Sequence, residues 1–136
     1  MATFVVFNSF KEAMPEKVHN LGSDTLKWML SNTAPSLANT VFADITEIAA
    51  GNGYTAGGAT AAVTSSAQTG GTYSLVLATT TFTAAGGGIG PFRYLVLYND
   101  TAASKELIGY LDYGTSYTLP DTQAFPVNAG TVLQIA

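Results

Sequence analysis

The feature that most constrains this chain is a run of residues, 92–98, in which every residue except Arg93 is aromatic or aliphatic. Successive side chains of a β-strand point to opposite faces of the sheet, so this run is apolar on both faces. A strand of this kind lies inside a sheet and is covered on each side. We therefore expect residues 92–98 to form a central strand between two covering layers.

Several other segments have the alternation or the composition of strands. Residues 25–31 place Leu26, Trp28 and Leu30 on one face. Residues 41–48 also alternate, but their two carboxylates leave a strand and an irregular segment both open. Further strands are expected at residues 3–7, 59–66, 72–82, 106–113 and 131–135, separated by glycine-rich loops at 49–58, 67–71 and 84–91 and a turn-and-edge region at 114–121.

One short helical turn is expected near the N-terminus. Ser9 is followed three residues later by Glu12, which is the spacing of a capping box, and Pro15 limits the length of the turn. About seven to nine short strands at roughly ten-residue spacing indicate an all-β fold. We expect an antiparallel β-sandwich or jelly roll with Gly-rich loops and at most one short N-terminal helix. It would form a single domain over residues 1–136, with residues 1–20 as a possible N-terminal arm.

Composition limits the classes of function. Charged residues make up 10% of the sequence, compared with about 25% in an average soluble domain, so small neutral groups and hydroxyls must cover most of the surface. The net charge of −4 without a basic run argues against nucleic-acid binding. No apolar run approaches the ~18 residues of a membrane span, and the first residues lack the basic region of a signal peptide. We expect that the protein has no nucleic-acid or membrane partner and that it is made in a cytoplasm.

The chain offers few residues for cofactor chemistry. It has no cysteine and one histidine, His19. Disulfides, thiolate nucleophiles and zinc–thiolate sites are therefore excluded, and an imidazole cluster for a metal cannot form. We expect no cofactor and no metal.

Three patterns resemble catalytic or binding motifs, and each has a plainer interpretation. Residues 86–90 are rich in glycine, but a proline and a strand follow where a phosphate-binding loop needs a helix. His19, Ser23 and Asp24 are the residue types of a hydrolase triad, although triad members converge from separate elements. Scattered carboxylates are interpreted as solvated turn residues, with a glycosidase pair or a cation site as open alternatives: Asp44, Glu47, Asp100, Asp112 and Asp121.

A row of tyrosines recurs on two segments that are expected to be adjacent strands. Such a row forms cross-strand pairs, a flat protein–protein interface or a stacking platform for sugars. The first two interpretations are favoured. The residues are Tyr94, Tyr98, Tyr110, Tyr113 and Tyr117.

Several segments follow one another in an order shared with a known class of proteins. They are residues 17–21 (KVHNL), 24–35 (DTLKWMLSNTAP), 43–48 (ADITEI), 51–58 (GNGYTAGG), 90–100 (GPFRYLVLYND) and 107–114 (LIGYLDYG). This order resembles that of small structural proteins of tailed bacteriophages. Proteins of this kind include capsid decoration (cement) proteins, head-fibre components and tail-associated proteins.

The resemblance implies a structural protein of the virion and not an enzyme. Its first expectation is a capsid decoration protein that is made in the bacterial host cytoplasm, binds the outer head and stabilises the capsomer lattice. The implied partners are the major capsid protein and further copies of the chain, as a homotrimer or, second, a homodimer. The alternative is a head-fibre or tail-associated protein that binds host glycan. An enzyme that degrades polysaccharide, a depolymerase fragment, is the weakest of the three hypotheses.

The apolar stretch at the N-terminus allows two interpretations. It is either the first strand of the sandwich or a contact with a neighbouring subunit or the shell. The residues concerned are Phe4, Val5, Phe7 and Phe10.

Overall fold

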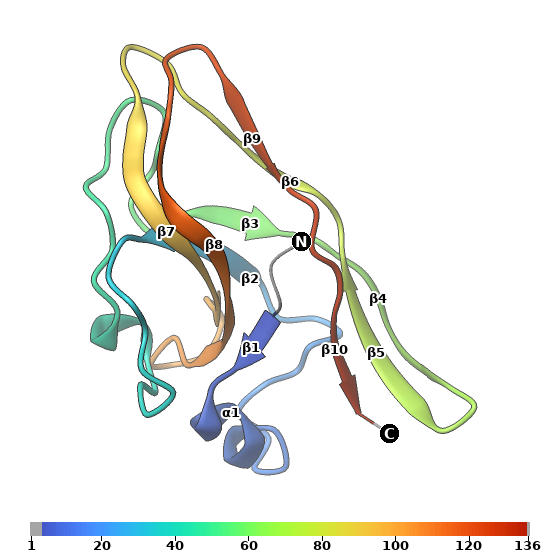
Figure 1. Cartoon of the computed structure of the whole chain (residues 1–136). Coiled ribbons are helices and arrows are strands. Elements are labelled where there is room, and N and C mark those ends of the chain that lie inside the picture. The colour runs from blue at the N-terminus through green and yellow to red at the C-terminus, as the bar shows by residue number, and fades with distance from the viewer. Residues whose placement is uncertain (1–3, 136) are drawn as a thin grey trace.

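The computed structural model describes residues 4–135, and its strands pair in antiparallel fashion throughout (Figure 1). The all-β antiparallel class is thus confirmed, and the arrangement is consistent with a sandwich, whereas a jelly roll is not confirmed. The elements are β1 (Phe4–Val6), α1 (Asn8–Ala13), β2 (Leu26–Ser31), the 3-10 turn η1 (Phe42–Asp44), β3 (Ala59–Ala61), β4 (Val63–Thr69), β5 (Thr72–Leu77), β6 (Thr80–Thr83), β7 (Ile89–Asn99), β8 (Leu107–Leu119), β9 (Ala124–Val127) and β10 (Gly130–Ile135).

The first layer is a five-stranded sheet in the order β1-β8-β7-β2-β3. Strand β7 lies between β8 and β2, and both of its faces are buried: Val96 and Leu97, which point to opposite sides, are 0% exposed. The expectation of a central strand covered on both sides is confirmed.

The second layer consists of two smaller sheets, β10-β5-β4 and β6-β9. The chain passes from β5 to β6 and from β9 to β10 through short bends. Leu77 faces Gly130 before the bend and Thr80 faces Val127 after it, so the same antiparallel register runs through both sheets. They therefore form one bent layer, which runs down the right of Figure 1.

The core lies on both sides of the first layer. One cluster fills the space between the layers and includes Trp28, Leu75 and Phe92, each 0% exposed. The other lies on the opposite face of β7 and β2, where side chains of these two strands pack against residues from other segments: Phe7, Met29, Ile45, Val96, Tyr98 and Leu107.

The structure differs from the sequence-based expectation in several segments. The turn expected at 67–71 is limited to Gly70 and Gly71, because β4 continues to Thr69, and the strand expected at 72–82 is divided into β5 and β6. The helix begins at Asn8 after the N-cap residue Phe7, so Ser9 lies inside it and forms no capping box. Of the two interpretations left open for residues 41–48, the irregular segment is the one observed: these residues form the turn η1 and isolated bridges. Residues 114–121 are not mainly a turn, because β8 continues through Gly114 to Leu119 and pairs there with the start of β7.

Gly58 provides a test of the junction between the 49–58 loop and β2. Its φ is +87°, and a Cβ at this position would overlap the carbonyl oxygen of Trp28. We expect Gly58→Ala to lower the free energy of unfolding by more than ~3 kcal/mol, because β2 cannot move without opening the core. Denaturant unfolding followed by tryptophan fluorescence measures this.

The matched control is Gly70→Ala. Gly70 also has a positive φ, +59°, but nothing lies within 4 Å of an added Cβ. Its cost should be the backbone cost alone, about 1–2 kcal/mol. Equal losses in both variants would show that the close approach to Trp28 is not what requires glycine at position 58.

Candidate assembly interface

The N-terminal segment is divided between core and edge. Phe7 and Phe10 are 0% and 3% exposed, and their rings pack on Tyr110 and His19 of the same chain. Phe4 is half-buried in β1, and its ring lies perpendicular to that of Trp28 at a centroid distance of 6.2 Å. Of the four residues named from the sequence, Phe7 and Phe10 are therefore buried in contacts with their own chain.

The other two, Phe4 and Val5, belong to an edge strand. Within residues 4–135, β1 pairs with β8 alone, so its outer backbone edge is open. Residues 4–20 thus pack on the sheet of their own chain, and β1 is the first strand of the five-stranded sheet.

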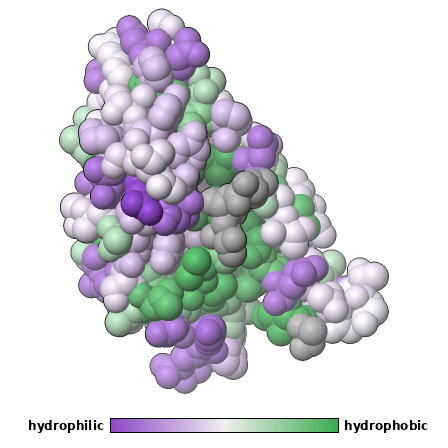
Figure 2. Space-filling model, in the orientation of Figure 1, coloured by the Kyte–Doolittle hydropathy of each residue, from purple (hydrophilic) through white to green (hydrophobic). Residues whose placement is uncertain are grey.

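An apolar groove lies between α1 and β10. It has a volume of about 460 Å³, and Ile135 at its end is 48% exposed. Figure 2 shows apolar residues gathered low on this face of the molecule. The apolar part of the lining is formed by Val6, Phe10, Met14, Pro15, Leu133 and Ile135.

Charge is distributed unequally between the layers. Strands β3 to β6, β9 and β10 contain no Asp, Glu, Lys or Arg, and the sequence has no charged residue between Glu47 and Arg93. The exposed positions of β6 and β10 are instead occupied by residues such as Thr81, Thr83 and Thr131. The outer side of the second layer is therefore neutral and rich in hydroxyl groups.

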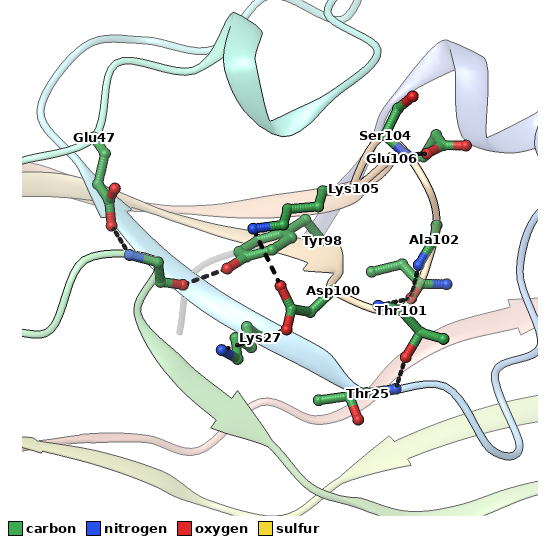
Figure 3. A network of polar contacts seen from close by, with 12 residues as sticks. Thr25, Lys27, Glu47, Tyr98, Asp100, Thr101, Ala102, Ser104, Lys105 and Glu106 are labelled. Atoms are coloured by element: carbon green, nitrogen blue, oxygen red, sulfur yellow. Dashed lines mark hydrogen bonds and ion pairs between the residues drawn. The ribbon is translucent and has the colours of Figure 1, made fainter.

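The first layer and its loops carry the ion pairs. Asp100 pairs with Lys27 at 3.4 Å and with Lys105 at 3.6 Å (Figure 3). Arg93 binds Asp112 through two hydrogen bonds of 2.8 and 3.1 Å, which lower the pKa of the Asp112 carboxyl. Each pair is partly exposed and therefore contributes little stability. These ion pairs thus lie on the first layer and its loops.

Asn99 joins the N-terminal segment to the end of β7. Its Oδ1 accepts hydrogen bonds from the amides of Thr101 and Ala102, which fixes the orientation of the side-chain amide. Its Nδ2 must then donate to Asp24 at 2.7 Å and to Nδ1 of His19 at 2.9 Å. The His19 ring is therefore neutral, with its proton on Nε2.

This arrangement does not form a hydrolase triad. Asn99 stands between His19 and Asp24, Ser23 is exposed, and Nε2 of the buried His19 has no hydrogen-bond partner. Burial lowers the pKa of His19, while the nearby carboxylates of Glu106 and Asp24 oppose this shift. His19 is thus held by Asn99, 80 positions further along the chain, and not by residues of its own turn.

Glu47 has a structural role that the sequence did not reveal. Its Oε2 accepts hydrogen bonds from the Tyr54 hydroxyl and the Gly57 amide, both at 2.6 Å, and the Tyr54 oxygen accepts one from the Leu30 amide. Burial and the bond to Glu47 raise the pKa of Tyr54. The contacts fasten the glycine-rich loop to β2. The one available signal was Tyr54, an aromatic residue set among glycines.

Of the remaining carboxylates, Asp121 is exposed in the turn after β8, and Asp44 has local partners. Asp44 accepts hydrogen bonds from the amides of Thr40 and Val41, which lower its pKa and close the turn before η1. In residues 4–135 no three acidic or histidine side chains are grouped so that they could hold a metal ion. No helix of that part of the chain has the length and hydropathy to cross a membrane.

The tyrosines of β7 and β8 do not form one platform. Tyr94 and Tyr98 are buried, whereas Tyr113 is 45% exposed on the other face of the sheet. Tyr113 packs against Tyr117 and Phe125, with centroid distances of 5.6 and 5.4 Å. Beside it lies a hollow of about 260 Å³ lined by Leu95, Leu111, Tyr113, Phe125, Pro126, Val127 and Asn128.

Comparison with known proteins adds no relative. No protein family, no curated protein and no solved structure matches the chain. The distribution of charge and the open strand edges are therefore the observations from which a function is argued.

Protonation of His19 should weaken the fold. The buried ring has a pKa below its ordinary value of 6.5, so the unfolded chain takes up the proton first as the pH falls. The protonated Nδ1 would also face the Asn99 amide, a second donor. We expect the free energy of unfolding to be highest above pH 6.5 and to fall below it, by at most about 1.4 kcal/mol per pH unit.

The variant His19→Gln isolates this effect. Denaturant unfolding at a series of pH values should give a flatter dependence between pH 7 and 5 for the variant, whatever its absolute stability. The loss at lower pH, where Asp112 and Asp44 take up protons, should remain in both proteins. An unchanged slope in the variant would mean that His19 does not control stability in this range.

Proposed function

We propose that the chain is a structural protein of a phage virion, and most directly a capsid decoration protein that lies on the outer head and bridges capsomers. The resemblance to small phage structural proteins suggests this class. The structural observation that carries the proposal is the uncharged second layer, with exposed Thr81, Thr83 and Thr131 on its strands.

A neutral hydroxyl-bearing surface suits a contact that must hold under changing salt. Ion pairs at a surface weaken as salt rises, and a buried charge without a partner is costly. A layer of threonine, serine and alanine avoids both penalties. We assign the second layer to contact with the major capsid protein, while the charged loops of the first layer face solvent and keep the particle surface soluble.

Repetition over a lattice makes modest contacts effective. A specific interface buries about 1,200–2,000 Å² in total, and a chain that touches two capsomers binds each of them at a high effective concentration. The proposed mechanism is therefore non-covalent clamping, which opposes the outward pressure of a packaged genome and requires no chemistry.

The first experiment is a copy number. Quantitative mass spectrometry of purified particles should give a ratio to the major capsid protein near one, or a simple fraction of it. A few copies per particle would move the protein to a vertex, fibre or tail position, and absence from particles would overturn the virion proposal.

The second experiment identifies the face. We expect Thr81→Lys to leave the fold intact but to reduce the number of copies on particles at least several-fold, because it places an unpaired charge in the contact. Ala103→Lys is the matched control, since it adds the same charge to an exposed loop beside the first layer. Equal occupancy of the two variants would mean that the second layer does not face the shell.

The hollow beside Tyr113 favours the alternative function. An exposed tyrosine next to Phe125 and an asparagine, Asn128, offers stacking and hydrogen bonding of the kind that sugars use. Under this alternative, a head-fibre or tail-associated protein would bind an oligosaccharide in a glycan array, and Tyr113→Ala would abolish the signal. If the protein does not bind to the glycan array and is present in particles at lattice copy number, the decoration proposal is supported.

A further inference from the structure

Strand β4 presents an open edge on a projecting hairpin. Within residues 4–135, β4 pairs with β5 alone, and it is the outermost strand of its sheet. The two strands are joined by Gly70 and Gly71, both at positive φ, a tight turn that continues the twist of the strands. The hairpin extends beyond the rest of the molecule at the lower right of Figure 1, so its edge is accessible to another strand.

This edge lacks the usual protection against strand pairing. Natural edge strands are short, bulged, or interrupted by proline or lysine. Strands β1 and β3 have three residues each, β9 contains Pro126, and β10 has a register shift between Thr131 and Leu133. Strand β4 has seven residues without charge or proline. Its one register shift lies at its start, between Val63 and Ser65, and from Ser65 to Thr69 the register is unbroken.

The register shows which backbone groups are free. A two-residue hairpin turn closes on a hydrogen-bonded pair, here Thr69 and Thr72, and hydrogen-bonded pairs alternate along the ladder. Ala67 therefore exchanges hydrogen bonds with β5, whereas the N–H and C=O groups of Ser66 and Gln68 point away from it. These groups are positioned to accept a further antiparallel strand.

We propose that two copies of this chain pair through their β4 strands, antiparallel and about a two-fold axis, to join two three-stranded sheets into one six-stranded sheet. A two-fold contact is closed and self-complementary, whereas head-to-tail pairing of the same edge would produce fibres. Pairing about a two-fold axis at Ala67 places Ala67 opposite its own copy and Ser66 opposite Gln68 of the other copy, so a charge near the axis would face the same charge. The neutrality of residues 48–92 removes that repulsion.

The size of the contact determines its strength. Seven residues at about 3.4 Å each give a short ladder, and such an edge buries less than the ~1,200 Å² of a stable complex. The free dimer is therefore weak and reversible. Its use on a capsid lattice, where neighbouring copies are held close together, rests on the proposed function; the pairing itself does not.

Sedimentation velocity of the purified chain, from low micromolar to about 1 mM, tests the pairing. We expect a monomer–dimer equilibrium in the parent protein and at least a ten-fold weaker association in Ala67→Lys, which places like charges at the two-fold. Thr81→Lys is the control, because it adds the same charge to another strand of the same layer. It should dimerise like the parent protein, although we expect it to lose occupancy on particles.

A mixture of charge variants keeps the test independent of folding defects. Ala67→Lys and Ala67→Glu should each be monomeric alone, and they should form a heterodimer when mixed at low salt. A parent protein that is monomeric throughout the range overturns the pairing, as does Ala67→Lys with unchanged association or a mixture that gains none. If the pairing fails but the protein is present in particles at lattice copy number, the decoration proposal still holds. If the chain forms the dimer but is absent from particles, the pairing holds and the virion proposal is wrong.

Discussion

The structure is organised by the need to cover both faces of β7. Its side chains are apolar on both sides, and the strand lies between β8 and β2, where its backbone groups are already paired. Water must then be excluded from two faces at once. The second layer covers one face, and the segments around Phe7 and Ile45 cover the other. A single apolar strand thus requires that the chain be wrapped on both sides of one sheet.

The two covers use different kinds of residues, and this produces the separation of charge. The cover around Phe7 and Ile45 is built from loops and turns, whose backbone groups need local partners. Asp44 and Asn99 supply such partners, and Lys27, Asp100 and Lys105 lie in or beside the same region. The second layer is built from strands that satisfy one another's backbone groups, so it needs no polar side chain of this kind. Its exposed positions are free to be neutral.

The parts of the fold that could be predicted depend on local pattern. Strands β7 and β2 follow from the residues within each segment, and so does the all-β class. The bends at Ala62 and at Ala78 could not be predicted, because alanine has no particular turn preference and the bends are imposed by pairing with distant strands. The continuation of β8 through Gly114 was missed for a similar reason, since its partner is the start of β7. The bridge from Asn99 to His19 spans 80 positions along the sequence, and no local signal connects them.

Neutrality of the second layer has a consequence for its edges. Charged side chains on edge strands are one of the means by which proteins prevent unwanted pairing, and a layer without charge must rely on geometry alone. Strand β9 uses Pro126, β10 uses an irregular register, and β3 ends after three residues and joins the first layer. None of these devices acts on residues 65–69 of β4, since the one register shift of that strand lies before Ser65. The same absence of charge that makes the layer suitable for lying against other proteins therefore leaves one edge open to a strand, and the tightly turned hairpin carries that edge away from the body of the molecule.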